Sequence, residues 1–308
     1  MTRPPDSAGS EVAMQDAHAN PLNWQTMALV ALTMMAFAAN SLLCRIALRQ
    51  EIIDAASFAS VRLVAGAITL LLIVRARASP PYAGGGEWLA ATMLFTYVVF
   101  FSFAYLTLPA GTGALILFGG VHLTMFSAGL YMGEKFGAIA WLGLALAVSG
   151  LVYLVSPGVA APAPLGAAMM AIAGVSWGVY SLRGRGVADP LAATAGNFLR
   201  AAPLALASSV ILIARAHTDA TGFILALTSG ALTSGVGYAI WYAALRRLSA
   251  TRAATVQLSV PLIAAFGGVA LLSEAITPRL LVSSAAILGG IALVLASKAH
   301  RKPERRPV

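Results

Sequence analysis

Apolar residues fill ten runs of roughly 20 positions, separated by short polar or turn-rich segments. A run of this length can cross the hydrocarbon layer of a bilayer as one α-helix. The sequence therefore predicts an all-α integral membrane protein with ten transmembrane helices. The expected spans are Trp24–Cys44, Ala55–Val74, Trp88–Leu108, Gly111–Met132, Gly137–Val155, Leu165–Leu182, Leu191–Ala214, Gly222–Leu245, Ala250–Leu272 and Arg279–Ala296.

The segments outside these runs divide the chain into two halves. Residues 1–23 are polar and lack the basic start and short apolar core of a signal peptide, so we expect a flexible tail there. A linker rich in Pro and Ala at 157–164 separates a first five-helix half, 24–156, from a second, 165–297. Residues 298–308 form a basic tail.

Lysine and arginine are distributed unequally between the two sides that ten alternating spans define. Cytoplasmic loops carry the excess of these residues, so both termini are expected in the cytoplasm, at a bacterial-type inner membrane. The sparse side holds Arg45, Arg49, Arg215 and Arg279. The rich side holds Arg3, Arg75, Arg77, Lys135, Arg183, Arg185, Arg246, Arg247, Arg252, Lys298, Arg301, Lys302, Arg305 and Arg306.

The two halves repeat one another at an offset of 140 residues. Glu134 then falls on Glu274, and both carboxylates stand where one apolar run stops and the next begins. Five spans per half is an odd number, so the second half enters the membrane in the opposite orientation. Two inverted repeats around a central cavity are a recurring plan of secondary transporters. Other matched positions are Arg45 with Arg185, Ala110 with Ala250, Ala114 with Ala254, Phe126 with Phe266 and Gly150 with Gly290.

Composition agrees with a lipid environment. The chain is 59% hydrophobic and only 10% charged, whereas a soluble domain carries about 25% charged residues. A net charge of +9 could suggest nucleic acid, but the basic residues lie between apolar runs rather than on one surface, so we expect no such partner. The single cysteine, Cys44, excludes an intrachain disulfide and a cysteine-rich metal site.

The sequence offers little for catalysis. Glu134 and Glu274 are expected at opposite faces, too far apart to act as a paired acid and base. His122, the one histidine inside a span, has no histidine or carboxylate at metal-ligand spacing. No phosphate-binding loop or hydrolase motif is present. We therefore expect no enzyme activity, no catalytic residue, no metal and no cofactor.

Polar and aromatic side chains at mid-span are the candidates for substrate binding. Clustered rings with polar tips can line a cavity for a flat or apolar solute, and the amide of Asn40 can both donate and accept. The alternative is ordinary packing, helix–helix hydrogen bonding or an interfacial belt. The candidates are Asn40, Tyr97, Phe101, His122, Trp177, Tyr180, Tyr238, Trp241 and Gln257.

Proline and glycine mark the candidate hinges. Pro261 lies inside a span, where its missing N–H favours a kink. Glycine pairs let helices approach closely or flex. The predicted gating residues are Pro261, Gly119, Gly120, Gly267 and Gly268.

Arg62 and Arg200 are mid-span charges at corresponding places in the two halves. An isolated cation costs about 2.5–3.5 kcal/mol or more in hydrocarbon, so each must face the protein or reach a head group. A structural role, contact with a substrate carboxylate and gating are all open.

Each half resembles the five-helix domain of the EamA-type drug/metabolite transporters. The resemblance covers 24–297. It rests on an aromatic-Gly pair in the first helix, an arginine in the second, a Pro in the fourth helix ahead of a Gly-Glu or similar pair, and a Gly-rich fifth helix. The residues are Phe37-Ala38 and Trp177-Gly178, Arg62 and Arg200, Pro261 with Ser273-Glu274, Val121 with Gly133-Glu134, and then Gly143 and Gly150. Phe37-Ala38 and Val121 depart from the pattern.

Within that family the chain is most similar to bacterial aromatic amino acid exporters. The resemblance implies a broadly selective exporter of aromatic and other apolar amino acids working by alternating access, with no obligate protein partner evident. Efflux of drugs or other small metabolites is the alternative. An intramembrane enzyme and a non-transporting receptor are remote ones.

Overall fold

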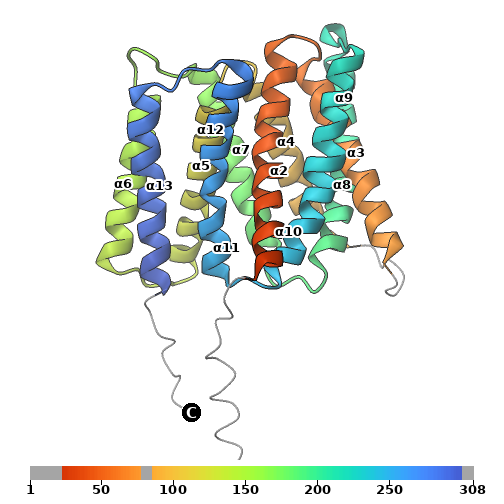
Figure 1. Ribbon diagram of the computed structural model, residues 1–308. Helices are drawn as coiled ribbons and strands as arrows, with labels where there is room; N and C mark the ends of the chain where they lie inside the picture. The colour runs from red at the N-terminus through yellow and green to blue at the C-terminus, as the bar shows by residue number, and fades with distance from the viewer. Residues whose placement is uncertain (1–22, 78–84, 300–308) are drawn as a thin grey trace, which may run out of the picture.

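The computed structural model describes residues 23–77 and 85–299. The predicted tails, 1–23 and 298–308, lie outside the described residues except at their inner ends, where Asn23 caps a helix and the last helix continues to Ala299. Regular structure in the described part is helical, apart from one isolated bridge between Ile53 and Thr218. Ten helical crossings are present, as the apolar runs predicted (Figure 1).

The first five crossings are single helices. They are α2 (Trp24–Arg49), α3 (Ala55–Ala76), α4 (Trp88–Ala104), α5 (Ala110–Tyr131) and α6 (Ala138–Val155). Two begin at side-chain caps, because Asn23 accepts from the N–H of Thr26 and Asp54 from those of Ala56 and Ser57. α2 continues beyond the predicted end at Cys44, so Arg45 and Arg49 belong to the helix.

Two of the other five crossings are built from consecutive segments. The single helices are α7 (Pro164–Arg183), α8 (Pro190–Ile211) and α13 (Pro278–Ala299), and a short 3-10 turn, η1 (Ile213–Arg215), follows α8. The eighth crossing joins α9 (Ala220–Thr228), the π-helix η2 (Ser229–Val236) and α10 (Gly237–Leu245). The ninth joins α11 (Ala250–Gln257) and α12 (Ser259–Leu272).

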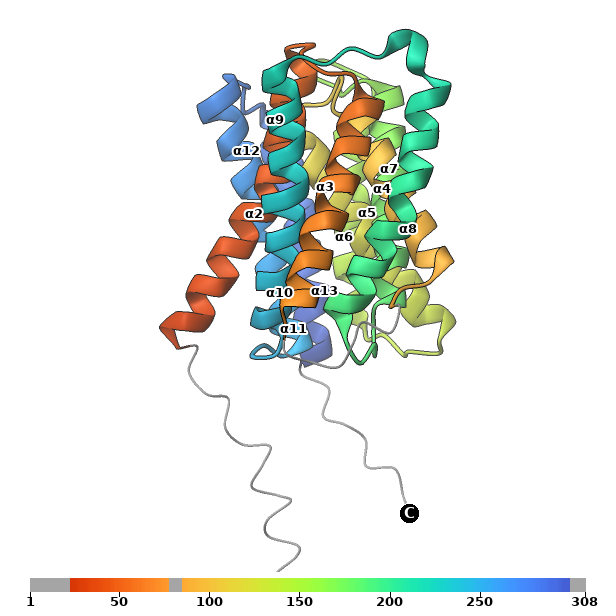
Figure 2. The ribbon, with the colours of Figure 1, turned by 90° about the vertical axis from the view of Figure 1, so that its right-hand side faces the viewer.

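Successive crossings run in alternate directions, so the chain ends at 23 and 299 lie on one face, here called the terminal face (Figures 1 and 2). The opposite side is the far face. α2 and α7, the first helices of the two halves, run in opposite directions. The terminal face holds Arg77, 85–87 and the connections 132–137, 184–189 and 246–249, and the far face holds the connections 50–54, 105–109, 156–163, 212–219 and 273–277.

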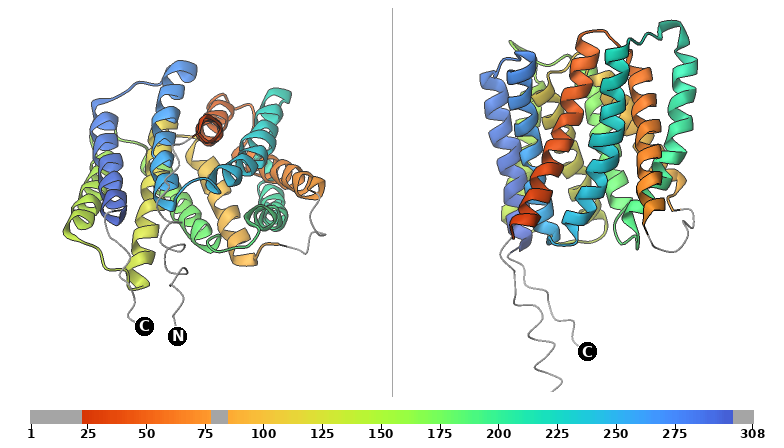
Figure 3. Two further views of the ribbon diagram at one scale, coloured as in Figure 1. Left: turned by 60° about the horizontal axis from the view of Figure 1, so that its bottom comes forward. Right: turned by 45° about the vertical axis from the view of Figure 1, so that its right-hand side comes forward.

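The helices form one bundle with a pair set to one side (Figure 3). α6 and α13 pack closely on each other there, and α3 packs on α8 at the opposite side. The close approach of α6 and α13 depends on glycine. A Cβ on Gly143 would lie 2.5 Å from the carbonyl oxygen of Gly290, and one on Gly290 would lie 2.6 Å from the amide nitrogen of Ala147.

The surface around the bundle is apolar. Eight helices are long and apolar enough to cross a membrane, and Trp88–Ala104 is a shorter apolar helix, within the described residues. Large apolar side chains remain exposed along the outside, including Leu72, Leu142 and Phe266. Such a surface is compatible with lipid and costly in water. The bundle is therefore a multi-pass membrane protein.

Two crossings depart from regular α-helix for identifiable reasons. Pro261 has no N–H for the carbonyl of Gln257, and the helix breaks at Leu258 between α11 and α12. In the eighth crossing, the helix takes the wider π form in η2, which packs against α3. Gly230 lets the two backbones touch, because a Cβ there would lie 2.9 Å from the Cα of Arg62. The sequence predicted a continuous span here, and π turns are too rare to expect from an apolar run.

A first prediction concerns the α6–α13 contact. Gly290→Leu places a side chain where the α6 backbone lies and should lower the melting temperature in detergent, because overpacking of this kind costs about 1–3 kcal/mol. Gly289→Leu is the matched control, since nothing lies within 4 Å of a Cβ at Gly289. Equal melting temperatures for the two variants would contradict the backbone contact.

Candidate functional site

A cavity of about 540 Å³ lies between the two halves and is lined mostly by aromatic and polar side chains. This volume is in the range that holds a small organic molecule. Helices from both halves line it: α2, α4, α5, α7, α8, α10 and α11. The rings that line it are Phe37, His122, Trp177, Tyr180, Trp241 and Tyr242, and the neutral polar groups include Ser181, Thr194, Asn197 and Gln257.

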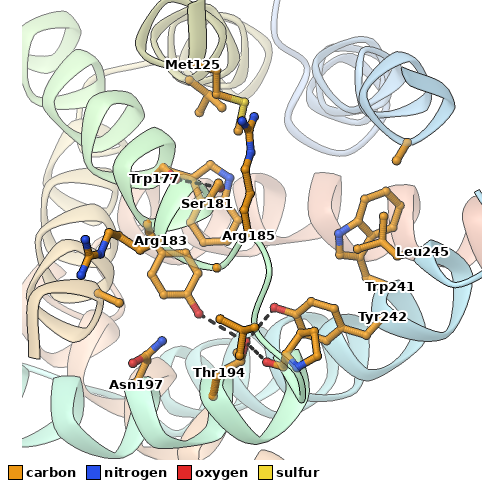
Figure 4. A pocket seen from close by; sticks show the side chains of 18 of the residues that line it. Met125, Trp177, Ser181, Arg183, Arg185, Thr194, Asn197, Trp241, Tyr242 and Leu245 are labelled. Atoms are coloured by element: carbon orange, nitrogen blue, oxygen red, sulfur yellow. Dashed lines mark hydrogen bonds between the residues drawn. The ribbon is translucent and has the colours of Figure 1, made fainter. Parts of the chain in front are cut away.

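Charged residues of the terminal face line one end of this cavity. Arg183 binds Glu87 with Nε to Oε1 at 2.5 Å and Nη2 to Oε2 at 2.8 Å, joining the start of α4 to the end of α7. These hydrogen bonds hold the pKa of the Glu87 carboxyl below its usual value. Arg185 projects into the cavity beside Met125 (Figure 4). Since both arginines are exposed, the cavity reaches the terminal face.

Trp177 is the centre of a continuous group of rings. It stacks on Tyr180 with ring centroids 5.2 Å apart and contacts Tyr97 at 4.8 Å and Tyr238 at 5.8 Å. Tyr238 in turn contacts Phe37, whose ring meets that of Trp241 edge to face with centroids 5.9 Å apart. Adjacent rings hold one another in place and present flat apolar faces to a ligand.

Hydroxyl groups form the polar side of the cavity. Thr194 Oγ1 donates to the carbonyl of Pro190 in its own helix, so its oxygen is left as an acceptor for the hydroxyls of Tyr242 at 2.7 Å and Tyr180 at 3.4 Å (Figure 4). Asn197 lies on the same face of α8 as Thr194, three residues further on. These neutral groups can bind a polar head without holding a fixed charge.

Behind the rings lies a buried polar cluster, centred on Asn40. Its Oδ1 accepts hydrogen bonds from Ser229 Oγ at 2.8 Å and from Thr233 Oγ1 at 2.6 Å, and Ser234 Oγ lies 3.5 Å away. Three hydroxyls of η2 therefore converge on one amide of α2. These bonds tie the first crossing to the eighth.

Arg62 extends this cluster and is 2% exposed. It donates to Ser234 Oγ at 3.3 Å and to Tyr97 Oη at 3.1 Å, and its guanidinium carbon lies 5.4 Å and 5.0 Å from the ring centres of Tyr97 and Phe101. Its Nη1 has no partner among the described residues. Arg200 instead binds the carbonyls of Gly85 and Gly196, so the two arginines hold different contacts.

The structure separates the nine predicted site residues into two sets. The first set lines the cavity: His122, Trp177, Tyr180, Trp241 and Gln257. The second lies one layer deeper, buried behind the lining: Asn40, Tyr97, Phe101 and Tyr238. His122 Nδ1 lies 2.8 Å from the carbonyl oxygen of Phe118, so it is the protonated nitrogen and donates.

Thr194, Asn197 and Tyr242 were missed, although the first two are polar at helical spacing in an apolar run. The roles of Arg183 and Arg185 were also missed, because a basic loop residue normally reports only orientation.

The predicted hinge residues lie in or beside tight contacts. Gly119 lines a second, more apolar cavity of about 440 Å³ between α5, α6, α11 and α13, which shares His122, Met125 and Arg185 with the first. A Cβ on Gly120 would lie 3.3 Å from the Cα of Gly174 in α7, so these two helices pack closely. Gly267 faces Leu42, and Gly268 faces Glu274. A hinge role for these glycines and for Pro261 stays a prediction.

The far face is closed by an ion pair between the halves. Arg45 Nε donates to Glu274 Oε1 at 3.2 Å, and the side chains are only 12% and 10% exposed. Arg49 donates to the carbonyl of Leu272 beside it. Nearby, the amides of Asp54 and Asp219 bind the carbonyls of His217 and Ile52, which joins the start of α3 to the start of α9.

The bundle therefore belongs to the class of membrane transport proteins, since it holds a cavity that reaches one face and is closed at the other. A family model described as the EamA-like transporter family matches residues 164–296. The chain is 49% identical over 277 residues to an uncharacterized protein of Pseudomonas aeruginosa, covering 90% of this chain and 96% of that protein. The chain belongs to the EamA-like transporter family, and is a transporter rather than an enzyme.

Two further comparisons are more distant. A protein of Streptantibioticus cattleyicolor named "probable terminal-alkyne amino-acid exporter" is 27% identical over 222 residues, covering 70% of this chain and 73% of that one. A crystal structure titled only as that of a protein has a TM-score of 0.61 at 19% identity and covers 89% of this chain and 99% of that chain. The second likeness concerns the fold alone.

A second prediction concerns the Asn40 cluster. Asn40→Ala removes the acceptor of the buried hydroxyls and should destabilise the protein by about 1–2 kcal/mol, measured as a lower melting temperature. Ser149→Ala is the control, because that exposed hydroxyl binds only its own helix at Leu146. If both variants melt like the parent protein, the cluster does not hold α2 to η2.

Proposed function

We propose that this transporter exports amino acids with aromatic or other apolar side chains. The observation that carries the proposal is the cavity itself, where rings and neutral hydroxyl and amide groups lie together. Rings such as Trp177 and Trp241 would contact the side chain of the solute. Asn197, Gln257 and the hydroxyl oxygen of Tyr242 would bind its amino and carboxylate groups. The name of the Streptantibioticus cattleyicolor relative supports an amino acid as the substrate class.

Broad selectivity follows from this chemistry. Apolar contact with a ring depends on area more than on shape, whereas hydrogen bonds fix orientation. The cavity is larger than one aromatic amino acid requires, and the adjoining apolar cavity adds room next to His122 and Met125. Efflux of larger apolar drugs or metabolites is the competing function, and it would draw on the same rings.

The direction of transport is argued from charge. In the described part of the chain, nine basic residues lie toward the terminal face and four toward the far face. The nine are Arg75, Arg77, Lys135, Arg183, Arg185, Arg246, Arg247, Arg252 and Lys298, and the four are Arg45, Arg49, Arg215 and Arg279. This excess on short loops supports a cytoplasmic terminal face. With this orientation in a bacterial inner membrane, the cavity opens toward the cytoplasm, and a substrate for export would enter it from there.

Two inverted five-helix repeats, 24–156 and 165–297, provide the mechanism that we propose. The opposite directions of α2 and α7 support it, as does the lining of the cavity by helices of both halves. Inverted halves can exchange conformations, so that a cavity reaching one face opens to the other. The break beside Pro261 is the position where α11 would bend against α12.

A third prediction tests the site. Trp177→Ala and Trp241→Ala should each raise the apparent KM for tryptophan or phenylalanine counterflow in proteoliposomes by about fivefold, because each removes a ring contact worth on the order of 1 kcal/mol. Trp24→Ala is the matched control, since Trp24 is 76% exposed on the outside of the bundle.

The same assay separates the competing functions. Counterflow of no amino acid by the parent protein would reject the substrate class. Competition by neutral aromatic compounds that lack both charged groups, at concentrations similar to those of amino acids, would favour drug or metabolite efflux instead.

A further inference from the structure

The ion pair at the far face is part of a larger interlock of five positions. Arg45 Nη1 donates to the carbonyls of Tyr105 at 2.9 Å and Leu106 at 3.0 Å, where α4 ends, while its Nε binds Glu274. Glu274 Oε2 accepts from the N–H of Ala110 at 2.8 Å, where α5 begins. A cation at a helix C-terminus and an anion at a helix N-terminus both stabilise the helix dipole.

Each of these five positions has a counterpart 140 residues away. Arg45 corresponds to Arg185 and Glu274 to Glu134, with the charged side chains kept. Ala110 corresponds to Ala250, and both residues begin a helix, α5 and α11. The carbonyls of Tyr105 and Leu106 correspond to those of Leu245 and Arg246, at the end of α10. The other three positions act through backbone groups, which any of these residues supplies. The second set therefore has every group that the first set uses.

The counterparts lie on the terminal face, and two of them, Arg185 and Leu245, line the cavity. Ala253 and Ala254, near the start of α11, also line it. Glu134 follows the end of α5. Glu134 and Arg185 are exposed, whereas the side chains of Arg45 and Glu274 are 12% and 10% exposed. The interlock is thus closed at the far face, whereas its counterpart positions lie at the face that the cavity reaches.

We propose that Arg185 and Glu134 form the same interlock when the cavity opens to the far face. Arg185 would bind Glu134 and the carbonyls of Leu245 and Arg246, and Glu134 would accept from the N–H of Ala250. The two interlocks would alternate, so that breaking one is compensated by forming the other. This proposal rests on the inverted repeats and alternating access proposed above, but not on the identity of the substrate.

Alternation of this kind keeps the two conformations close in free energy. Breaking a partly buried ion pair leaves both charges unsatisfied, which would trap the protein with its far face closed. A matching pair at the other face offsets this cost. Removing one interlock should therefore shift the population toward the conformation that the other interlock holds.

A cysteine at position 181 can report the mouth of the terminal face, because Ser181 lines the cavity there. Ser181→Cys would be placed in a Cys44→Ser background, which removes the single native thiol. Labelling by a bulky maleimide is measured in lipid nanodiscs without substrate, where both faces are accessible. Labelling is expected to be fast in the parent protein, and roughly fivefold slower in Glu274→Gln or Arg45→Gln, because the terminal mouth closes.

The decisive comparison adds a second change to Glu274→Gln. Arg185→Gln or Glu134→Gln in that background should restore fast labelling, because the counterpart interlock can no longer form. Arg247→Gln is the matched control: it removes the same charge from the same face, but Arg247 binds Gln25 outside the cavity. It should leave labelling slow. Glu134→Arg in the same background should also make labelling fast.

Fast labelling in Glu274→Gln, or slow labelling that Arg185→Gln and Glu134→Gln do not reverse, would overturn the proposal. Melting temperatures of each variant within the range of the parent ensure that labelling reports conformation rather than unfolding. Amino acid counterflow is measured separately. Its absence, together with the expected labelling pattern, would reject the proposed substrate and leave the alternating interlock standing.

Discussion

The absence of water from the hydrocarbon layer is the constraint on which this structure depends. A polar group there must find its partner within the protein, since lipid offers none. The hydroxyls of η2 meet this requirement on Asn40, and Arg62 meets it in part on Ser234, Tyr97 and the π-faces of two rings. The polar atoms therefore gather in the interior, and the cavity between the halves is lined with rings and polar groups.

The rings separate this dry interior from the cavity. Tyr97 and Tyr238 lie behind Trp177, so the polar cluster is covered on the cavity side by aromatic carbon. A solute that enters from the terminal face passes the charged residues Glu87, Arg183 and Arg185 before it meets the rings and the neutral hydroxyls. Arg62 lies behind this layer, and its hydrogen bonds among the described residues go to hydroxyl groups, so it adds a positive potential behind the rings.

Much of the fold could be predicted from the sequence, because bilayer thickness fixes how long an apolar run must be. The tenth span, predicted as Arg279–Ala296, is observed as Pro278–Ala299, and the family was predicted correctly. The ion pair between Arg45 and Glu274 could not be predicted, since 229 residues separate them and the other partners of each side chain are also distant in the sequence. The π turns of η2 and the depth of Tyr97 depend on how helices meet, which periodicity does not specify.

The backbone contact between α6 and α13 limits where the bundle can deform. Two helices whose carbonyls and amides meet through Gly143 and Gly290 cannot slide without colliding with their own main chains. These two helices must separate before they can slide, so we expect the pair to move as one rigid unit. Lipids on that flank of the bundle then meet a surface of constant shape, whatever the other eight crossings do.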